Sequence, residues 1–181
     1  FTIAQSGGST SVSESGTTDT FTIVLNAQPT SDVVLSISSS DTGEATVTSL
    51  LSFTNANWNS AQTVTVTGVD DDLVDGTKNS TITITVVDVI SDDSFDSVAD
   101  QTVSAATTDN DVAGFTITQS GGSTSVSESG STDTFTVVLN AQPASNVVLS
   151  ISSSDTGEAT ATSLLNFTSA NWNSAQTVTV T

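Results

Sequence analysis

Apolar and polar residues alternate through most of the chain. In the segments 21–25, 33–37 and 82–86 every second residue is Phe, Ile, Leu or Val, and Thr or Ser fills most positions between them. A period of two is that of a β-strand with one buried face and one wet face. Because Thr is β-branched, it favours the strand even on the exposed side.

Clusters of turn-forming residues separate these runs at Ser6–Gly8, Asn26–Pro29, Ser38–Gly43, Asn55–Ser60 and Asp70–Asn79. No stretch has the 3.6-residue period and capping residues of a helix. The pattern predicts seven strands, the first of them broken: 1–5 with 10–13, 20–26, 32–38, 45–54, 61–68, 80–89 and 97–108. Seven strands in about 110 residues are typical of an immunoglobulin-like antiparallel β-sandwich, so we expect an all-β fold.

The first part of the chain is repeated almost exactly. Residues 1–67 recur as 115–181, with 59 of 67 positions identical. A period of 114 residues is too long for a solenoid and fits one autonomous domain. We therefore expect a complete sandwich at 1–114 and the first five strands of a second, truncated sandwich at 115–181. Long tandem arrays of this kind serve length or valency more often than chemistry.

Composition narrows the possible functions. The chain has 66 Ser and Thr among 181 residues, and its 20 acidic residues face one basic residue, Lys78, which gives a net charge of -19. The absence of Cys and His removes thiol and imidazole catalysis, disulfides and the usual zinc sites. Such a negative surface repels nucleic acid and anionic membranes, and no apolar run is long enough to insert into a bilayer. We expect the protein not to be an enzyme.

The acidic residues gather where strands end. In an up-and-down sandwich the first, third, fifth and seventh strands end at the same pole, which collects the carboxylates Glu14, Asp41, Glu44, Asp70, Asp71, Asp72, Asp75, Asp109 and Asp111. Calcium takes six to eight oxygen ligands and is the cation that suits them. Asp70 and Asp72 point to the same side of an extended chain and could share an ion. The alternative is a solvated acidic loop.

Several of these segments resemble the Calx-beta family, namely Val12-Ser13-Glu14, the run from Val69 through Asp70-Asp71-Asp72 to Gly76, and Thr108-Asp109-Asn110-Asp111. The stretch from Ser40 through Trp58 to Val66 is similar to the tandem form in very large bacterial surface proteins and adhesins. The resemblance implies a seven-stranded sandwich that binds calcium through Glu14, Asp70, Asp71, Asp72, Asp75, Asp109 and Asp111. Two departures from the family pattern are Asn110 within the last acidic triplet and the loop that offers Asp41 and Glu44. Glu128 is the counterpart of Glu14 in the second repeat and completes the candidate ligands.

These observations predict a fibre-building extender on the cell surface, whose partners are neighbouring repeats of the same chain and which calcium stiffens between domains. One alternative is an adhesin module that binds a surface glycan through Trp58 and Trp172, although a core-closing role for these Trp residues is more common. Another is a filament subunit joined to other copies by strand complementation, because the second repeat lacks two strands. The positions of Phe1, Phe21, Phe53 and Phe115 match the core parity of their strands.

Overall fold

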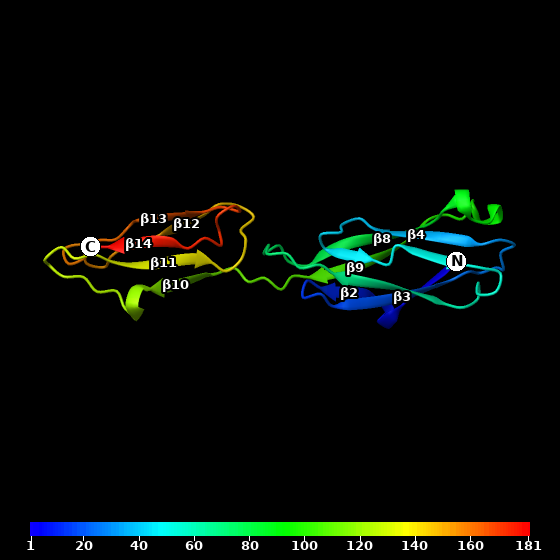
Figure 1. Cartoon of the computed structure of the whole chain (residues 1–181), viewed down its shortest axis with the longest axis horizontal. Helices are drawn as coiled ribbons and strands as arrows, with labels where there is room; N and C mark the ends of the chain where they lie inside the picture. The colour runs from blue at the N-terminus through cyan, green and yellow to red at the C-terminus, as the bar shows by residue number, and fades with distance from the viewer. The chain divides into compact units, whose positions relative to one another are not determined.

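The computed structural model describes all residues from Phe1 to Thr181, and the chain folds into two compact units. Strands β1 to β9 belong to the first unit and strands β10 to β14 to the second (Figure 1). The strands of the first unit are β1 (Thr2–Gln5), β2 (Thr10–Ser13), β3 (Thr18–Val24), β4 (Val33–Ser39), β5 (Ala45–Val47), β6 (Leu50–Phe53), β7 (Gln62–Gly68), β8 (Lys78–Val86) and β9 (Gln101–Thr108).

The first unit is a β-sandwich of two sheets. One sheet has the order β1-β3-β7-β5 and the other the order β2-β9-β8-β4-β6. Neighbouring strands are antiparallel, except that β2 runs parallel to β9. The predicted all-β, immunoglobulin-like sandwich is confirmed.

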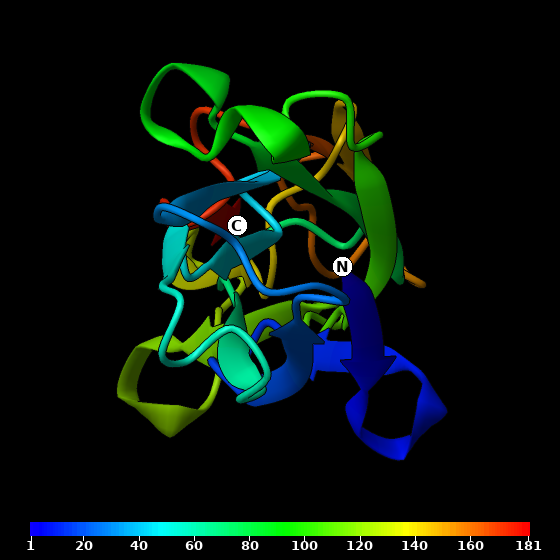
Figure 2. The ribbon, with the colours of Figure 1, turned by 90° about the vertical axis from the view of Figure 1, so that its right-hand side faces the viewer.

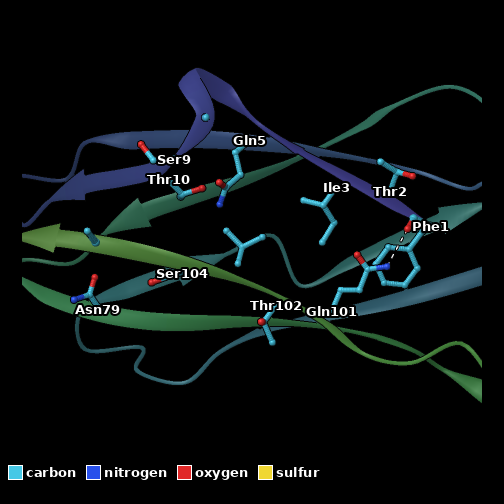
Figure 3. Close-up of a pocket in the computed structure, with 13 residues that line it drawn as sticks. Phe1, Thr2, Ile3, Gln5, Ser9, Thr10, Asn79, Gln101, Thr102 and Ser104 are labelled. Carbon is cyan, nitrogen blue, oxygen red and sulfur yellow. Dashed lines mark hydrogen bonds between the residues drawn. The ribbon is translucent and has the colours of Figure 1, made fainter.

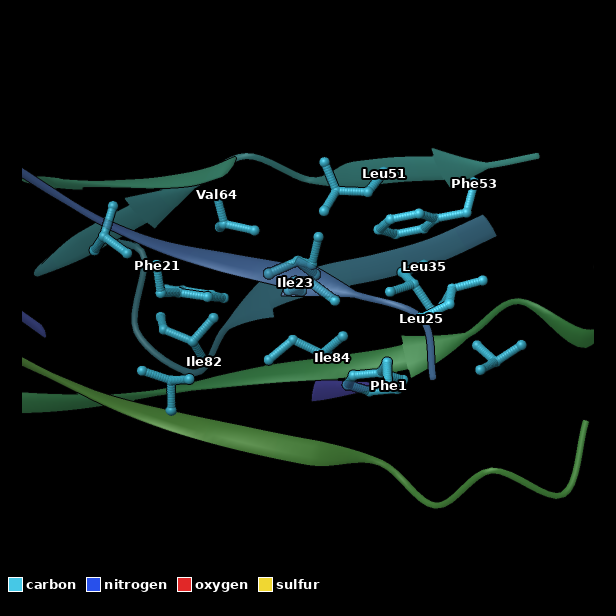
Figure 4. Packing of buried hydrophobic residues seen from close by; sticks show 14 of the residues in the cluster. Phe1, Phe21, Ile23, Leu25, Leu35, Leu51, Phe53, Val64, Ile82 and Ile84 are labelled. Atoms are coloured by element: carbon cyan, nitrogen blue, oxygen red, sulfur yellow. The ribbon is translucent and has the colours of Figure 1, made fainter. Parts of the chain in front are cut away.

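The apolar side chains of the alternating segments fill the space between the two sheets. Phe21 and Ile23 on β3 and Ile82 and Ile84 on β8 are at most 1% exposed, and Figure 4 shows them packed together with Phe53 from β6. The Thr residues between them face outward on the same strands. Burial of this aliphatic and aromatic face is the main force that holds the sandwich together.

The predicted strand 45–54 is wrong as a single element. It divides into β5, which pairs with β7 in one sheet, and β6, which pairs with β4 in the other. The change of partner occurs between two adjacent residues, since Thr48 N–H donates to Thr65 while Ser49 C=O accepts from Ile37. The predicted break in the first strand is present, at the 3-10 turn η1 (Ser6–Gly8).

Residues 88–96 form two short 3-10 turns, η2 (Asp88–Ile90) and η3 (Asp93–Phe95), that project beyond the strands (green, top of Figure 2). Asp92 anchors this segment. One of its carboxylate oxygens accepts hydrogen bonds from Thr30 N–H (2.6 Å), Thr30 Oγ1 (2.7 Å) and Ser31 N–H (2.9 Å), and the other accepts from Ser94 N–H (3.0 Å). The strands β8 and β9 are therefore shorter at their connection than the predicted 80–89 and 97–108.

The second unit contains five strands: β10 (Phe115–Gln119), β11 (Asp133–Leu139), β12 (Val147–Ser150), β13 (Leu164–Phe167) and β14 (Gln176–Val180). A sheet of order β10-β11-β14 faces the pair β12-β13, with Val137, Phe167 and Val178 at most 3% exposed. The core position predicted for Phe115 is wrong, because this side chain is 51% exposed, whereas Phe1 at the same place in the first repeat is 9% exposed. The predicted domain boundary between residues 114 and 115 stays a prediction.

The two Trp side chains are half-buried, and each packs against the core of its own unit, Trp58 against the first and Trp172 against the second. The carbonyl oxygen of Trp58 also accepts a hydrogen bond from Leu25 N–H (3.1 Å). These contacts are those of an aromatic side chain that closes one end of a core. No helix of the molecule has the length and apolar character that a membrane-crossing helix needs.

Candidate metal centre

Glu14 follows directly after β2, and its side chain is 1% exposed. Its backbone N–H donates to Thr108 C=O (3.1 Å), which extends the parallel pairing of β2 and β9 by one residue. Gly68 at the end of β7 lies against the same turn, where a Cβ atom would stand 2.1 Å from Ser13 O. Only glycine permits so close an approach of two backbones. The carboxylate of Glu14 is thereby enclosed at the end of the sandwich.

Glu44 reaches the same end from the loop between β4 and β5, and its side chain is 8% exposed. Its carbonyl oxygen accepts hydrogen bonds from Val69 N–H (2.9 Å) and Thr107 Oγ1 (3.3 Å), so the loop is fixed to both sheets. The exposed Asp41 shapes this loop, because its Oδ1 accepts from Gly43 N–H (3.0 Å) in an Asx-type turn. The Asp41 carboxylate therefore stabilises its own turn, and Glu44 is the residue of this loop whose carboxylate is buried.

Two hydrogen bonds join the loop after β7 to the segment after β9, and a third joins the segment after β9 to Glu14. Gly76 N–H donates to Asp109 Oδ2 (2.7 Å), and Asn110 Nδ2 donates to Asp70 Oδ1 (3.0 Å). The backbone N–H of Asn110 donates to Glu14 Oε2 (3.1 Å). Gly76 adopts a φ of 73°, which disfavours other residues at this position. Segments far apart in sequence therefore converge on Glu14.

Two groups of three carboxylates result. One group is Glu14 with Asp109 and Asp111, and the other is Glu14 with Glu44 and Asp75; within each group one oxygen per residue lies within 4.8 Å of the others. Two oxygens bound to one calcium ion at about 2.4 Å each lie at most about 4.8 Å apart. The spacing within each group is thus compatible with a shared ion, and Glu14 belongs to both groups.

Electrostatics favour a cation at this end. At 4 Å two like charges repel by about 1 kcal/mol in water and by about 4 kcal/mol at the effective dielectric constant of 20 found near protein surfaces. Five carboxylates gather here, and two of them, Glu14 and Glu44, are buried. Lys78 is the only basic side chain of the protein, and it begins β8 opposite Thr107. One ammonium group balances only a fifth of this charge, whereas each divalent cation offsets two carboxylates.

The other predicted ligands lie outside both groups. Asp70 and Asp72 are exposed, Asp71 is half-buried, and Asp41 is exposed in its own turn. Neither Asp70 nor Asp72 belongs to either group; Asp75 is the residue of this loop that lies near Glu14 and Glu44. Glu128 is exposed, in contrast to its counterpart Glu14.

Two residues that organise the centre were not recognised as such from the sequence. Asn110 was noted only as a departure from an acidic triplet, yet its backbone and side-chain amides bind Glu14 and Asp70. Nothing in the sequence indicated that Gly68 has a role, because that role depends on how closely β7 approaches Ser13. Neither contact involves residues close in sequence, so no local motif reports it.

A concave surface lies elsewhere on the first unit. It is a groove of about 940 Å³ between β1 and β9, lined mainly by Ser, Thr, Gln and Asn side chains (Figure 3). Gln101 Nε2 donates to Phe1 O (2.9 Å) at one end of this groove. No acidic residue lines it, so the groove is separate from the carboxylate groups.

Comparison with models of protein families and with curated protein sequences finds no match. Among solved structures, the E. coli chaperone DraB aligns with 93% of this chain and 86% of its own, at 8% identity and a TM-score of 0.43. The calcium binding domain CBD12 of CALX1.1 aligns with 99% and 75%, at 15% identity and a TM-score of 0.38. Domains 5–6 of the S-layer protein SbsC align with 99% and 82%, at 19% identity and a TM-score of 0.36. These likenesses concern the immunoglobulin-like β-sandwich fold alone.

Proposed function

We propose that this chain is part of a tandemly repeated extracellular surface protein whose β-sandwiches bind calcium and act as extenders. The observation that carries the proposal is the pair of carboxylate groups, Glu14 with Asp109 and Asp111 and Glu14 with Glu44 and Asp75, with Glu14 in both groups. The sequence resemblance to Calx-beta repeats points to the same end of the sandwich.

The chemistry of the donor set favours calcium over other metals. Every side chain in the two groups is a carboxylate, which is a hard oxygen ligand. Zinc and copper prefer the nitrogen and sulfur ligands of His and Cys, which this sequence lacks. Magnesium rarely binds in cages built only from protein groups and demands near-ideal octahedral geometry. Extracellular calcium modules work at dissociation constants of about 0.1–1 mM, which suits a surface protein.

Calcium bound at Glu14 would act on the connection to the next repeat. Asp109 and Asp111 lie in the segment between β9 and β10, and residues 112–114 are all that separate Asp111 from β10. An ion held by Glu14, Asp109 and Asp111 fixes the first part of this segment to the sandwich. The conformational freedom of the connection falls accordingly, which is the mechanical property that an extender needs. The proposed role involves no catalysis.

Calcium dependence of stability and length tests this proposal. A ligand that binds only the folded form adds about 2.7 kcal/mol at 100 times its Kd. For a domain of about 100 residues this raises Tm by roughly 10 °C. We expect the full chain to melt at higher temperature in millimolar calcium than in excess chelator, and to give a narrower distribution of sizes in small-angle X-ray scattering. Equal Tm values in calcium and chelator, or an equal rise with magnesium at matched ionic strength, would contradict calcium binding.

A further inference from the structure

The second unit has an apolar groove on its surface. The groove measures about 340 Å³ and is lined by Phe115, Ile117, Phe135, Val137, Leu149 and Ile151, with two serines. Phe115 is 51% and Ile117 is 53% exposed. Clustered apolar side chains on a protein surface are uncommon unless something covers them.

The first unit shows what covers the same positions. Five of the six apolar residues are identical in the first repeat, and the sixth differs by one methylene group, Ile23 against Val137. In the first unit these positions belong to or pack against the core that Ile82 and Ile84 from β8 complete (Figure 4). Val103 and Ala105 from β9 are buried in the same cluster. The groove therefore has the lining of a surface that receives the β8–β9 hairpin.

The backbone of the second unit gives independent support. β2 pairs with β9 in the first unit, yet its counterpart, residues 124–127, forms no strand. β4 pairs with β8 up to Ser39, yet its counterpart β12 ends at Ser150, and residues 151–153 form no strand. The segments 124–127 and 151–153 are identical in sequence to their counterparts in the first repeat, 10–13 and 37–39. Their loss of strand structure coincides with the absence of neighbouring strands, not with a change of residues.

We propose that this groove is a docking site for a β-hairpin with the pattern of β8–β9, in which Ile and Val point inward and Thr points outward. The first strand of the hairpin pairs antiparallel with residues 149–153, as β8 pairs with 35–39. The second strand pairs parallel with 124–127, as β9 pairs with 10–13. Both strands are needed, because the two edge segments, 124–127 and 149–153, belong to different parts of the unit. A single extended peptide would satisfy only one of them.

A synthetic peptide of residues 78–108, added to the full chain, tests the proposal. We expect one peptide to bind per chain with a Kd in the micromolar range by calorimetry. Hydrogen exchange should slow at the amides of Thr124, Val126 and Ser152 when the peptide binds, because Ser125, Ser127 and Ile151 already donate within the second unit. The amides of 10–13 and 37–39 are an internal control, since they are already paired in the first unit and should not change.

Two neighbouring substitutions on β10 distinguish the groove from the opposite face. Ile117 lines the groove and Thr118 does not, although both are exposed. Ile117→Asp should weaken peptide binding at least tenfold, and Thr118→Asp should leave it unchanged. A peptide in which Ile82 and Ile84 are replaced by Asp should not bind. Absence of binding, equal effects of the two variants, or a dimer that buries this face and excludes the peptide would overturn the proposal.

Discussion

The backbone N–H of Asn110 donates a 3.1 Å hydrogen bond to Glu14 Oε2 across 96 residues of sequence. This bond connects the end of β2 with the segment that follows β9, and Asn110 Nδ2 extends the connection to Asp70. The carboxylate of Glu14 is therefore held in a defined position before any cation arrives. Preorganised ligands lose less entropy on binding an ion than mobile ones.

Removal of the Glu14 charge should have opposite effects with and without calcium. In excess chelator, Glu14→Gln relieves repulsion from the other carboxylates, and the amide oxygen can still accept from Asn110 N–H. We expect its Tm to equal or exceed that of the wild type in chelator and to fall below it in calcium. Thermal unfolding followed by circular dichroism gives both values. A lower Tm in both conditions would assign Glu14 a purely structural role.

Gly68→Ala should destabilise the first unit. The added Cβ would meet Ser13 O at 2.1 Å, so the backbone of β7 or of the Glu14 turn must move. Overpacking of this kind costs about 2 kcal/mol, or roughly 10 °C in Tm. Gly43→Ala is the control, because its new Cβ would meet only Asp41 Oδ1, at 3.2 Å. Similar melting of the two variants would show that β7 does not need to approach Ser13 closely.

Asp92 should make the free energy of unfolding depend on pH in the acidic range. Hydrogen bonds from the Ser94 side chain, then from Thr30 and Ser31, hold the pKa of this carboxyl group well below its ordinary value of 3.8. A lowered pKa stabilises the folded state above the unfolded pKa, and this contribution is lost as pH falls through the folded pKa. We therefore expect Asp92→Asn to melt earlier than the wild type at pH 7, and the difference to shrink below about pH 4.

Asp93→Asn serves as the control for Asp92, since Asp93 lies next to it and is exposed. It should melt like the wild type throughout the pH range. A constant difference between Asp92→Asn and the wild type from pH 7 to pH 2 would contradict the role of the charged carboxylate.

Trp58→Ala should lower stability. The indole packs against the core of the first unit and is half-buried, so its removal should cost about 2 kcal/mol, less than for a fully buried Trp. Chemical denaturation measures this change, and Trp172→Ala reports the same position in the second unit. A stable Trp58→Ala variant that loses binding to immobilised glycans would instead favour the adhesin alternative.

The strands could be predicted from sequence because each buries one face, so that Phe21, Ile23 and Ile82 appear at alternate positions. The division of 45–54 could not be predicted, since Ala45 on β5 and Phe53 on β6 keep the same core parity on either side of the change of sheet. Parity also failed for Phe115. Phe115 lies on a strand as predicted, but alternation along one strand does not report which other strands cover its side chain.

Nine carboxylates were predicted for one pole of the sandwich, and five of them form the two groups. Strand polarity placed the acidic loops at one end of the sandwich, and they do converge there. Which carboxylates face inward depends on local turns: Asp75 lies near Glu14, whereas Asp70 accepts a hydrogen bond from Asn110 and is exposed. Glu14 and Glu128 also differ in exposure, since Glu14 is buried and Glu128 is exposed. Their sequences agree, but only Glu14 is covered by a segment after a ninth strand.

A comparison of Glu14 with Glu128 tests calcium binding by the proposed centre most directly. Isothermal titration calorimetry with calcium should be performed on the full chain and on the variants Glu14→Gln and Glu128→Gln, which remove the same charge from the same local sequence. We predict that Glu14→Gln weakens calcium binding by at least about tenfold and that Glu128→Gln binds like the wild type. Equal binding by all three proteins, or no heat of binding for the wild type in millimolar calcium, would contradict the account.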